Sequence, residues 1–260
     1  MGIAPLRVGA GRIPVPLAWC GGCDLFIRQM RQEMIRERAA TAGYAWEENR
    51  EPLLVRRRDF FTYLLNLAAR HGPVRSLLDV GTSYGHLLRI ALDSGVQAAG
   101  VEVVPQLRDS VREELGVPCW ADLMEAEGLY DLVAFVDSFY YFDDPHAAIA
   151  KSEQLLTSQG RILFRVTNRN LLIRVLRLLK LEGEYRQIGD VAVSWSLRGF
   201  RRLLASHGMR VEEAKFYERG WRRPIARRVT TATLAAASTA TARIWDTPIS
   251  PGLIVIASRT

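Results

Sequence analysis

Carboxylates and glycines that could hold a nucleotide lie close together between residues 76 and 102. The segment Ser76–His86 reads S-L-L-D-V-G-T-S-Y-G-H, where apolar residues lead to Asp79 and two glycines, Gly81 and Gly85, follow. Glycine lets the backbone approach a ligand closely, and a helix that starts there points its amino terminus at it. A second apolar run, Gln97–Glu102, ends in a carboxylate that can accept hydrogen bonds from both ribose hydroxyl groups. The spacing predicts a nucleotide site.

A strand, a tight turn and a helix must position these residues, and the rest of the chain continues the same alternation. The apolar run before Asp79 is typical of a buried parallel strand. Further strands are predicted at 117–121, 130–137, 160–168, 211–217 and 253–257. Helices are predicted at 51–71, 105–115 and 171–181, and another begins at Asp144-Pro145, with Asp144 as its cap. We therefore expect an α/β fold with a doubly wound, mostly parallel sheet of seven strands.

The segment 76–102 resembles motifs I and II of class I S-adenosylmethionine-dependent methyltransferases. The resemblance rests on Asp79 in the strand, the G-x-x-x-G turn and Glu102 at the end of the next strand. The usual turn in that family is G-x-G-x-G, so Ser83 replaces the middle glycine. Y-D-L-V-A-F-V-D at 130–137 matches a further motif, and the resemblance covers about residues 50–260. The fingerprint G-x-G-x-x-G is missing, which argues against the alternative of an NAD-dependent oxidoreductase.

The resemblance implies the Rossmann-like methyltransferase sheet, with its last strand antiparallel, and S-adenosylmethionine as the cofactor. In such a site Glu102 binds the ribose, Asp122 binds the adenine amino group, and Leu123 lies against the ring. Asp122 has a second interpretation as a helix cap. The residues expected to bind the cofactor are Asp79, Gly81, Thr82, Ser83, Gly85, Glu102, Asp122, Leu123, Asp137 and Ser138.

Methyl transfer from a sulfonium is an in-line displacement, so the enzyme chiefly aligns donor and acceptor. A hydroxyl acceptor also needs a base, commonly a histidine or a carboxylate. Among four histidines, His86 follows the glycine turn, while Tyr141, with Tyr140 and Asp137, stands at the mouth of the 130–137 strand. We predict Tyr141 and His86 as the catalytic residues. Relatives carry a Glu-His pair, able in some branches to bind metal, where this chain has Tyr140-Tyr141, so no metal-assisted mechanism is expected.

The N-terminal motif W-C-G-G-C-D-L-F has three interpretations. A thioredoxin-type redox site needs a preceding strand and sheet, and only 19 residues precede Cys20. A zinc site needs four ligands, and no second cysteine pair lies nearby. Third, the motif resembles the second half of the N-terminal zinc knuckle of many small-molecule methyltransferases, matched by Cys20, Cys23, Leu25 and Phe26. The first half is missing, which implies a degenerate knuckle, and we predict no metal site. Cys119 is expected in the core.

We expect two parts in the chain, an appendage over residues 1–50 and a methyltransferase domain over 51–260. Residues 1–18 are punctuated by Gly and Pro and are predicted to be irregular. Apolar residues at helical spacing follow (Phe26, Met30, Met34 and Ile35), and then Tyr44–Trp46. The resemblance implies that this connecting segment is a lid over the substrate, and a packing helix is the alternative. Arg56, Arg57 and Arg58 are interpreted as a solvated face.

Composition and charge limit the cellular location and the partners expected for this protein. With 260 residues and 48% apolar residues, the chain can bury a sizeable core. It has no apolar run of roughly 20 residues and no secretory N-terminal core, so a cytoplasmic protein is expected. The net charge of +7 could attract acidic substrates, lipid headgroups or nucleic acid. We expect no nucleic-acid partner, because no motif of interleaved basic and aromatic residues is present.

We expect S-adenosylmethionine-dependent methylation of a small molecule, either a sugar, a secondary metabolite or a lipid-linked glycan, on oxygen. A methyltransferase-like scaffold without activity is an alternative, motivated by Ser83 and the lack of a clear base. Within residues 171–181, Arg174, Arg177 and Lys180 form a basic stripe on an apolar helix. Such a helix fits peripheral contact with a membrane surface, and a packing helix or a substrate lid with one wetted edge is the alternative.

Overall fold

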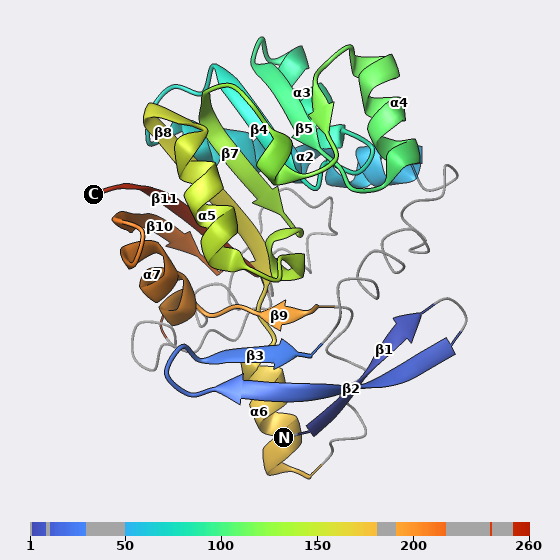
Figure 1. The fold of residues 1–260 in the computed structure, drawn as a ribbon, viewed down its shortest axis with the longest axis vertical. Helices are drawn as coiled ribbons and strands as arrows, with labels where there is room; N and C mark the ends of the chain where they lie inside the picture. Colours follow the sequence, from blue (N-terminus) through green and yellow to red (C-terminus); the bar gives the residue numbers. More distant parts are fainter. Residues whose placement is uncertain (1, 9–10, 30–49, 181–190, 217–239, 241–251) are drawn as a thin grey trace.

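A sheet of seven strands forms the centre of the molecule (Figure 1). The computed structural model describes residues 2–8, 11–29, 50–180, 191–216, 240 and 252–260. The strand order is β10-β11-β8-β7-β4-β5-β6, and β11 alone runs antiparallel to its neighbours. The strands are β4 (Ser76–Val80), β5 (Gln97–Val101), β6 (Cys119–Trp120), β7 (Tyr130–Val136), β8 (Leu156–Thr167), β10 (Met209–Lys215) and β11 (Gly252–Arg259). The predicted α/β fold with its antiparallel last strand is confirmed.

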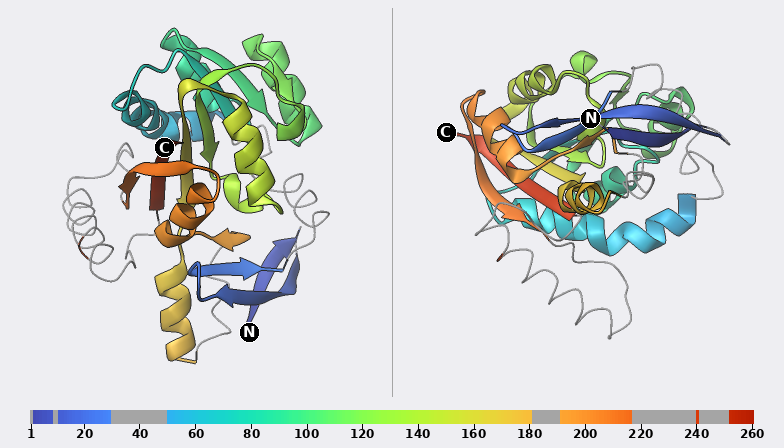
Figure 2. Two further views of the ribbon diagram at one scale, coloured as in Figure 1. Left: turned by 60° about the vertical axis from the view of Figure 1, so that its left-hand side comes forward. Right: turned by 90° about the horizontal axis from the view of Figure 1, so that it is seen from below.

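Helices cover both faces of this sheet (Figure 2). They are α2 (Arg50–Ala69), α3 (His86–Asp93), α4 (Pro105–Leu115), α5 (Pro145–Gln154) and α7 (Leu197–Ala205). A further helix, α6 (Asn170–Leu178), packs away from this sheet, and η3 (Leu123–Glu125) and η4 (Phe139–Tyr141) are short 3₁₀ helices. The predicted helices are confirmed in place, except that residue 181 lies outside the described part. Asp144 caps α5 as expected, because its side chain accepts a hydrogen bond from Ala147 N at 2.9 Å.

The strands alternate between two hydrophobic clusters, one on each face. Leu77 and Leu132 pack against α2 and α3, whereas Leu78 and Val133 pack against α5 and α7. Phe135 joins the second cluster and is fully buried. This double burial explains why the central strands read as uninterrupted apolar runs.

The prediction that residues 1–18 are irregular is wrong. They form the hairpin of β1 (Gly2–Val8) and β2 (Gly11–Cys20), and β3 (Leu25–Arg28) pairs with the end of β2. Two prolines, Pro14 and Pro16, lie in the part of β2 that pairs with β1 but not with β3. A proline without its N–H is tolerated where one side of a strand is unpaired. Phe26, expected to begin a run of helical spacing, lies in strand β3. The other residues of that run, from Met30 on, lie outside the described part.

These strands belong to a second sheet of order β1-β2-β3-β9, whose last strand, β9 (Val193–Ser194), comes from the far half of the chain. The sheet lies beyond the ends of β4 and β7, with α6 packed on it (Figures 1 and 2). That contact buries Leu17 and Phe26 against Ile173 and Leu176. The boundary predicted at residue 50 stays a prediction, since residues 30–49 lie outside the described part.

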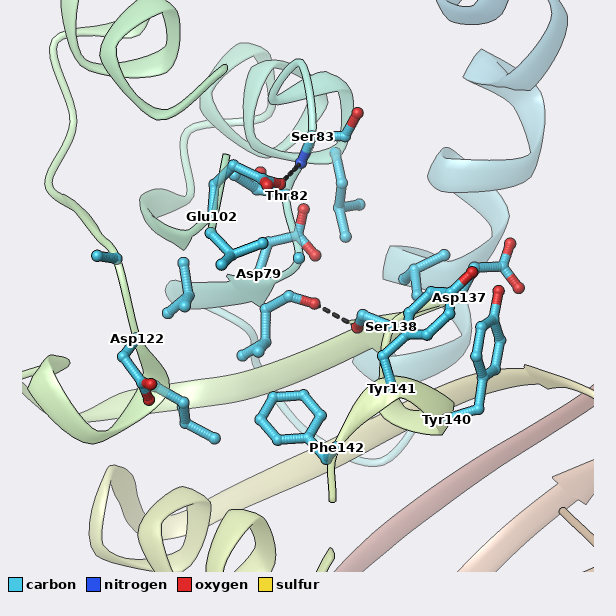
Figure 3. Close-up of a pocket in the computed structure, with 18 of the residues that line it drawn as sticks. Asp79, Thr82, Ser83, Glu102, Asp122, Asp137, Ser138, Tyr140, Tyr141 and Phe142 are labelled. Carbon is cyan, nitrogen blue, oxygen red and sulfur yellow. Dashed lines mark hydrogen bonds between the residues drawn. The ribbon is translucent and has the colours of Figure 1, made fainter. Parts of the chain in front are cut away.

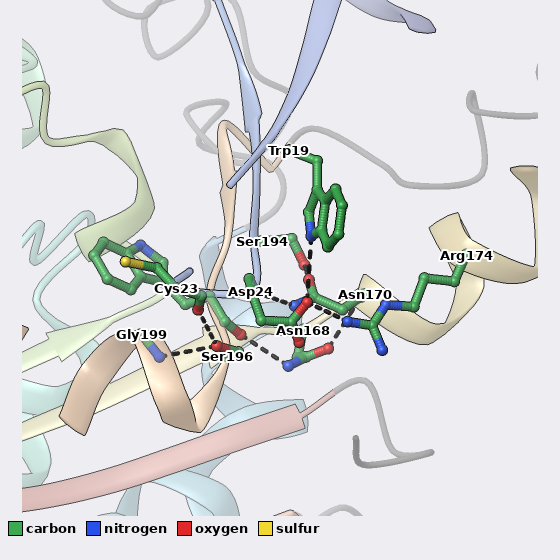
Figure 4. Close-up of polar contacts among 10 residues, drawn as sticks. Trp19, Cys23, Asp24, Asn168, Asn170, Arg174, Ser194, Ser196 and Gly199 are labelled. Carbon is green, nitrogen blue, oxygen red and sulfur yellow. Dashed lines mark hydrogen bonds and ion pairs between the residues drawn. The ribbon is translucent and has the colours of Figure 1, made fainter. Parts of the chain in front are cut away.

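A polar cluster around Asp24 joins the second sheet to α6 (Figure 4). The Asp24 carboxylate accepts hydrogen bonds from Trp19 Nε1 at 3.4 Å and from the Arg174 guanidinium. The Asp24 backbone carbonyl accepts one from Asn170 Nδ2 at 2.5 Å, and Ser194 Oγ donates to Asn170 Oδ1 at 2.6 Å. The turn between β2 and β3 is thereby fixed to β9 and to the start of α6.

None of the described helices is both long and apolar enough to cross a membrane. The sequence also predicts a helical insertion at residues 221–246, rich in Arg, Ala and Thr, and all of it except residue 240 lies outside the described part.

Candidate functional site

A cavity of about 680 Å³ opens where β6, β5, β4 and β7 end (Figure 3). Because neighbouring parallel strands end at the same edge, the segments that follow them line the cavity in spatial order: Asp122, Glu102, the turn after Val80, and Asp137. This edge is where ligands of open α/β sheets bind. All ten predicted cofactor residues except Gly85 line the cavity.

The backbone of the glycine turn is left-handed at three positions, and only two of them are occupied by glycine. Gly81 has φ +82°, and a Cβ there would lie 2.6 Å from the Cβ of Ser138. Gly85 has φ +70°, and a Cβ there would lie 2.8 Å from Leu115 Cδ1. Ser83 has φ +51°, a left-handed conformation that costs a residue with a side chain about 1–2 kcal/mol. That conformation explains why glycine would suit the position that Ser83 occupies.

Glu102 is a buried carboxylate fixed by two backbone N–H groups. Ser83 N donates to its Oε2 at 2.7 Å and Val104 N to its Oε1 at 2.9 Å. A carboxylate offers about four acceptor positions, so these two bonds leave capacity for ligand hydroxyl groups. Burial raises the pKa of the Glu102 carboxyl above its usual range, while the hydrogen bonds from Val104 and Ser83 oppose that rise.

Asp79 lies at the floor of the cavity and is 4% exposed. Burial, and to a smaller extent the nearby charge of Glu102, raise its pKa to about 7. Asp79 therefore titrates in the neutral range.

The segment after β6 places Asp122 and Leu123 in the cavity wall. The Asp122 carboxylate accepts a hydrogen bond from Met124 N at 2.9 Å and caps η3. The helix-cap interpretation is thus confirmed, and the same residue still faces the cavity. Leu123 is 1% exposed and presents an apolar surface.

The far end of the cavity follows β7. Asp137 has φ +61°, and its carboxylate pairs with the Arg165 guanidinium and lies 3.7 Å from Arg57 Nη1. The Asp137 carboxylate and the hydroxyl groups of Tyr140 and Tyr141 point to the same end of the cavity (Figure 3). The two tyrosine rings meet edge to face with centroids 4.6 Å apart. Carboxylate and phenol groups at one point can orient an acceptor hydroxyl.

Arg57 is a cavity residue that sequence reasoning missed. The run of three arginines predicts a solvated face, but the Arg57 side chain is only 32% exposed and lines the cavity. Arg58, its neighbour, is 64% exposed and pairs with Asp93 at 3.8 Å. The available signal was helical spacing, because Arg57 lies four residues before Phe61 and therefore on the buried side of α2.

The four histidines lie in different surroundings. His86 lines the cavity, is 8% exposed and stacks on Tyr84 with ring centroids 5.7 Å apart. His71 Nε2 lies 2.8 Å from Glu213 Oε2, and His146 Nδ1 lies 3.1 Å from His207 Nε2. Only His86 is therefore in position to meet a ligand of this cavity.

Cys20 ends β2, and Cys23 lies in the turn between β2 and β3. Hydrogen bonds from Cys23 lower the pKa of the Cys20 thiol. Across the described part of the chain, no three residues of the His, Cys, Asp and Glu types gather as a metal site would require. The degenerate knuckle stays a prediction. Cys119 is buried as expected, and burial raises its pKa to about 12.

Solved structures share this fold at low sequence identity. The plantazolicin methyltransferase BpumL, in complex with S-adenosylhomocysteine, is 16% identical over 86% of this chain and 90% of that chain, with a TM-score of 0.55. A putative methyltransferase bound to the Trm112 activator of Haloferax volcanii is 19% identical over 88% and 98%, with a TM-score of 0.56. A TehB-like S-adenosylmethionine-dependent methyltransferase of Corynebacterium glutamicum is 14% identical over 82% and 99%, with a TM-score of 0.51.

None of the curated proteins matches the chain. The family model described as a methyltransferase domain matches residues 46–214, which is more than half of the chain. The match includes the glycine turn, Glu102, Asp122 and the end of β7, the segments that line the cavity. The chain belongs to the methyltransferase domain family and is a class I S-adenosylmethionine-dependent methyltransferase.

Proposed function

We propose that S-adenosylmethionine lies along the edge of the main sheet, from the end of β6 to the end of β7. Asp122 and Leu123 hold the adenine, Glu102 accepts the two ribose hydroxyl groups, and the Gly81–Gly85 turn closes on the methionyl part. The single observation that carries this assignment is Glu102. Its buried carboxylate is held by two backbone N–H groups and keeps acceptor positions for a diol. An apolar wall at Leu123 suits a ring.

The bound cofactor supplies a methyl group on a positively charged sulfur. The chain's own contribution is to align the acceptor with that methyl group, to exclude water and to receive a proton. Alignment alone supplies several kcal/mol. Carboxylates that line the cavity favour a bound cation because opposite charges attract strongly where water is excluded.

The proposed acceptor is a small molecule, methylated on oxygen. Tyr141 is the proposed catalytic contact, because its hydroxyl and the Asp137 carboxylate point to the same end of the cavity (Figure 3). There Tyr141 orients the acceptor hydroxyl. His86 remains the proposed proton acceptor, and its stacking on Tyr84 fixes its ring at the cavity wall. A cavity lined by aromatic rings at this end suits an acceptor smaller than a folded protein.

Two further proposals concern the surroundings of the cavity. Residues 1–50 are proposed to act as a lid on the domain over 51–260, supported by the position of the second sheet near the ends of β4 and β7. The outer side of α6 is proposed to contact anionic lipid at a membrane surface. Val175, Leu178 and Leu179 are 41%, 82% and 57% exposed there, beside two basic side chains, Arg177 and Lys180.

Calorimetric titration tests the cofactor assignment. The protein should bind S-adenosylhomocysteine and should not bind NAD. Tight NAD binding without S-adenosylhomocysteine binding would overturn the assignment. A screen of candidate small molecules for S-adenosylhomocysteine release then tests the acceptor class, and release only with a protein substrate would contradict it.

A further inference from the structure

Two cysteines, Cys20 and Cys23, carry thiols that the proposed function does not use. Both are partly exposed, whereas Cys119 is buried in the core. They stand three positions apart at the tight turn that joins β2 to β3. The sequence argument against a redox site is that no strand and sheet precede the pair. The structure removes this argument, because β1 and β2 form a hairpin before the turn.

Hydrogen-bond donors of the turn converge on the Cys20 sulfur. The backbone N–H of Cys23, the Cys23 thiol and the backbone N–H of Gly22 donate to Cys20 Sγ and lower the pKa of its thiol, while burial opposes them. These donors stabilise the thiolate, which is the nucleophilic form of a cysteine. The contact from the Cys23 thiol also places the two sulfur atoms next to each other.

A cationic side chain lies beside the same turn. A Cβ at Gly22 would lie 3.0 Å from Nη1 of Arg202, an exposed residue of α7. The charge of this guanidinium also favours the Cys20 thiolate. A partly exposed sulfur with N–H donors and a nearby cation is the environment in which cysteines react. Cys20 is therefore the attacking thiol of the pair.

The backbone of the turn is fixed, which keeps the second thiol in reach. Ser196 Oγ donates to the Cys23 carbonyl at 2.8 Å (Figure 4), and Asn170 Nδ2 donates to the carbonyl of Asp24, the next residue, at 2.5 Å. A four-residue turn holds its outer Cα atoms within about 7 Å of each other. Disulfides join Cα atoms about 4.4–6.8 Å apart, so a bond between Cys20 and Cys23 is compatible with such a turn.

We propose that Cys20 and Cys23 form a thiol–disulfide exchange site for small-molecule disulfides. The Cys20 thiolate attacks one sulfur of the disulfide, whose S–S bond breaks and releases one half as a thiolate that takes a proton from water. The Cys23 thiol then loses its proton, and its sulfur attacks the Cys20 sulfur. This step forms the Cys20–Cys23 bond and releases the second half, which takes up that proton. Two protein thiols are oxidised, and one disulfide is reduced to two thiols.

The test uses oxidised glutathione as the probe, with the full chain at pH 7 and mass spectrometry after acid quenching. The wild-type protein should form the Cys20–Cys23 disulfide, and dithiothreitol should reverse it. C23S should stop at a mixed disulfide of glutathione with Cys20, formed about tenfold faster than any adduct of C20S. C119A is the control, because it removes only the buried thiol and should react like the wild type.

Three results would overturn the proposal. The first is a wild-type protein that keeps mixed glutathione disulfides without a link between Cys20 and Cys23. The second is an equal rate of adduct formation in C20S and C23S. The third is a protein purified with one zinc ion per chain, whose thiols react only after a chelator removes the metal, since the pair would then be a metal site.

A second variant keeps both cysteines and provides the comparison if C20S or C23S does not fold. R202Q removes the nearby cation and should slow disulfide formation about two- to fivefold at low salt. R201Q is its matched control, because Arg201 is the preceding exposed residue of α7 and should leave the rate unchanged. An equal rate in R202Q and the wild type would count against the proposed activation of Cys20.

Discussion

The Glu102 and Asp79 carboxyl groups are buried in one cavity, but they differ in the hydrogen bonds that they receive. Glu102 receives hydrogen bonds from Ser83 N and Val104 N, which stabilise its charged form against the cost of burial. For Asp79 burial dominates, and its pKa rises to about 7. One carboxylate is thus held ready to accept hydrogen bonds, while the charge of the other depends on pH.

Replacing Glu102 with alanine should weaken S-adenosylhomocysteine binding by about 1–3 kcal/mol, because two ligand hydroxyl groups lose their acceptor. Calorimetry gives the affinity, and E113A is a suitable control because Glu113 is exposed on α4 and does not line the cavity. An E102A protein that binds as tightly as the wild type would show that the ribose contact is misplaced.

The raised pKa of Asp79 predicts a pH-dependent stability. The folded state holds a proton on Asp79 up to about pH 7, whereas the unfolded chain releases it near the ordinary aspartate pKa of 3.8. The folded state thus binds more protons in this window, so the free energy of unfolding falls as pH rises from about 4 to 7. D79N stays neutral and should lose this fall, giving a gain of about 1–4 kcal/mol over the wild type at pH 8 and little gain at about pH 4.

Urea unfolding of wild type and D79N between pH 4 and pH 8 measures this difference. Parallel stability profiles for the two proteins would contradict the assignment of the raised pKa to Asp79.

The site residues that the sequence predicts are recognised from a short local pattern, whereas the one it misses depends on a contact with a residue far along the chain. Asp79, Gly81 and Glu102 lie within 24 consecutive positions whose pattern alone predicts a strand, a turn and a strand end. The role of Arg57 depends on Asp137, which is 80 positions further along the chain. No local pattern reports that pairing, so a run of three arginines is interpreted as solvated.

The glycine turn couples backbone conformation to packing between β4 and β7. At Gly81 a side chain would meet both an unfavourable φ of +82° and the Ser138 Cβ at 2.6 Å. At Gly95 the φ is +76°, but no atom lies within 4 Å of an added Cβ. Comparing alanine variants at Gly81 and Gly95 therefore separates the cost of a left-handed φ from the cost of a steric clash with Ser138.

We expect G81A to lower the free energy of unfolding by about 2–4 kcal/mol, since strain and overpacking add. G95A should lower it by only about 1–2 kcal/mol, the cost of the left-handed conformation. Urea denaturation measures both. Equal losses in the two variants would mean that Ser138 moves aside at little cost.

The strands were predicted unequally well for physical reasons. The central strands are buried on both faces, and their apolar runs identify them. The second sheet gives no such signal, because β9 is two residues long and β2 contains prolines that suit irregular structure as well as an unpaired strand side. This sheet is held by contacts between residues far apart in the sequence, such as the hydrogen bond from Asn170 Nδ2 to the Asp24 carbonyl, which are 146 positions apart.

The molecule separates its charges. It carries +7 overall, yet acidic side chains predominate in the cavity wall. Basic side chains lie instead on the outer side of α6, where Arg177 and Lys180 flank the exposed Leu178. A cationic cofactor is drawn to the cavity, and an anionic surface would be drawn to the exterior.

This separation predicts binding to anionic vesicles at low salt. Each basic residue near such a surface contributes about 1 kcal/mol, and buried leucine side chains add to it. Co-sedimentation should recover the wild-type protein with phosphatidylglycerol-containing vesicles and much less of it with phosphatidylcholine alone. L178S should reduce the sedimented fraction, whereas L129S should not, because Leu129 is 62% exposed but precedes β7, away from α6. Wild-type protein that stays in the supernatant with both kinds of vesicle would rule out the membrane contact and leave an acceptor that reaches the cavity from solution.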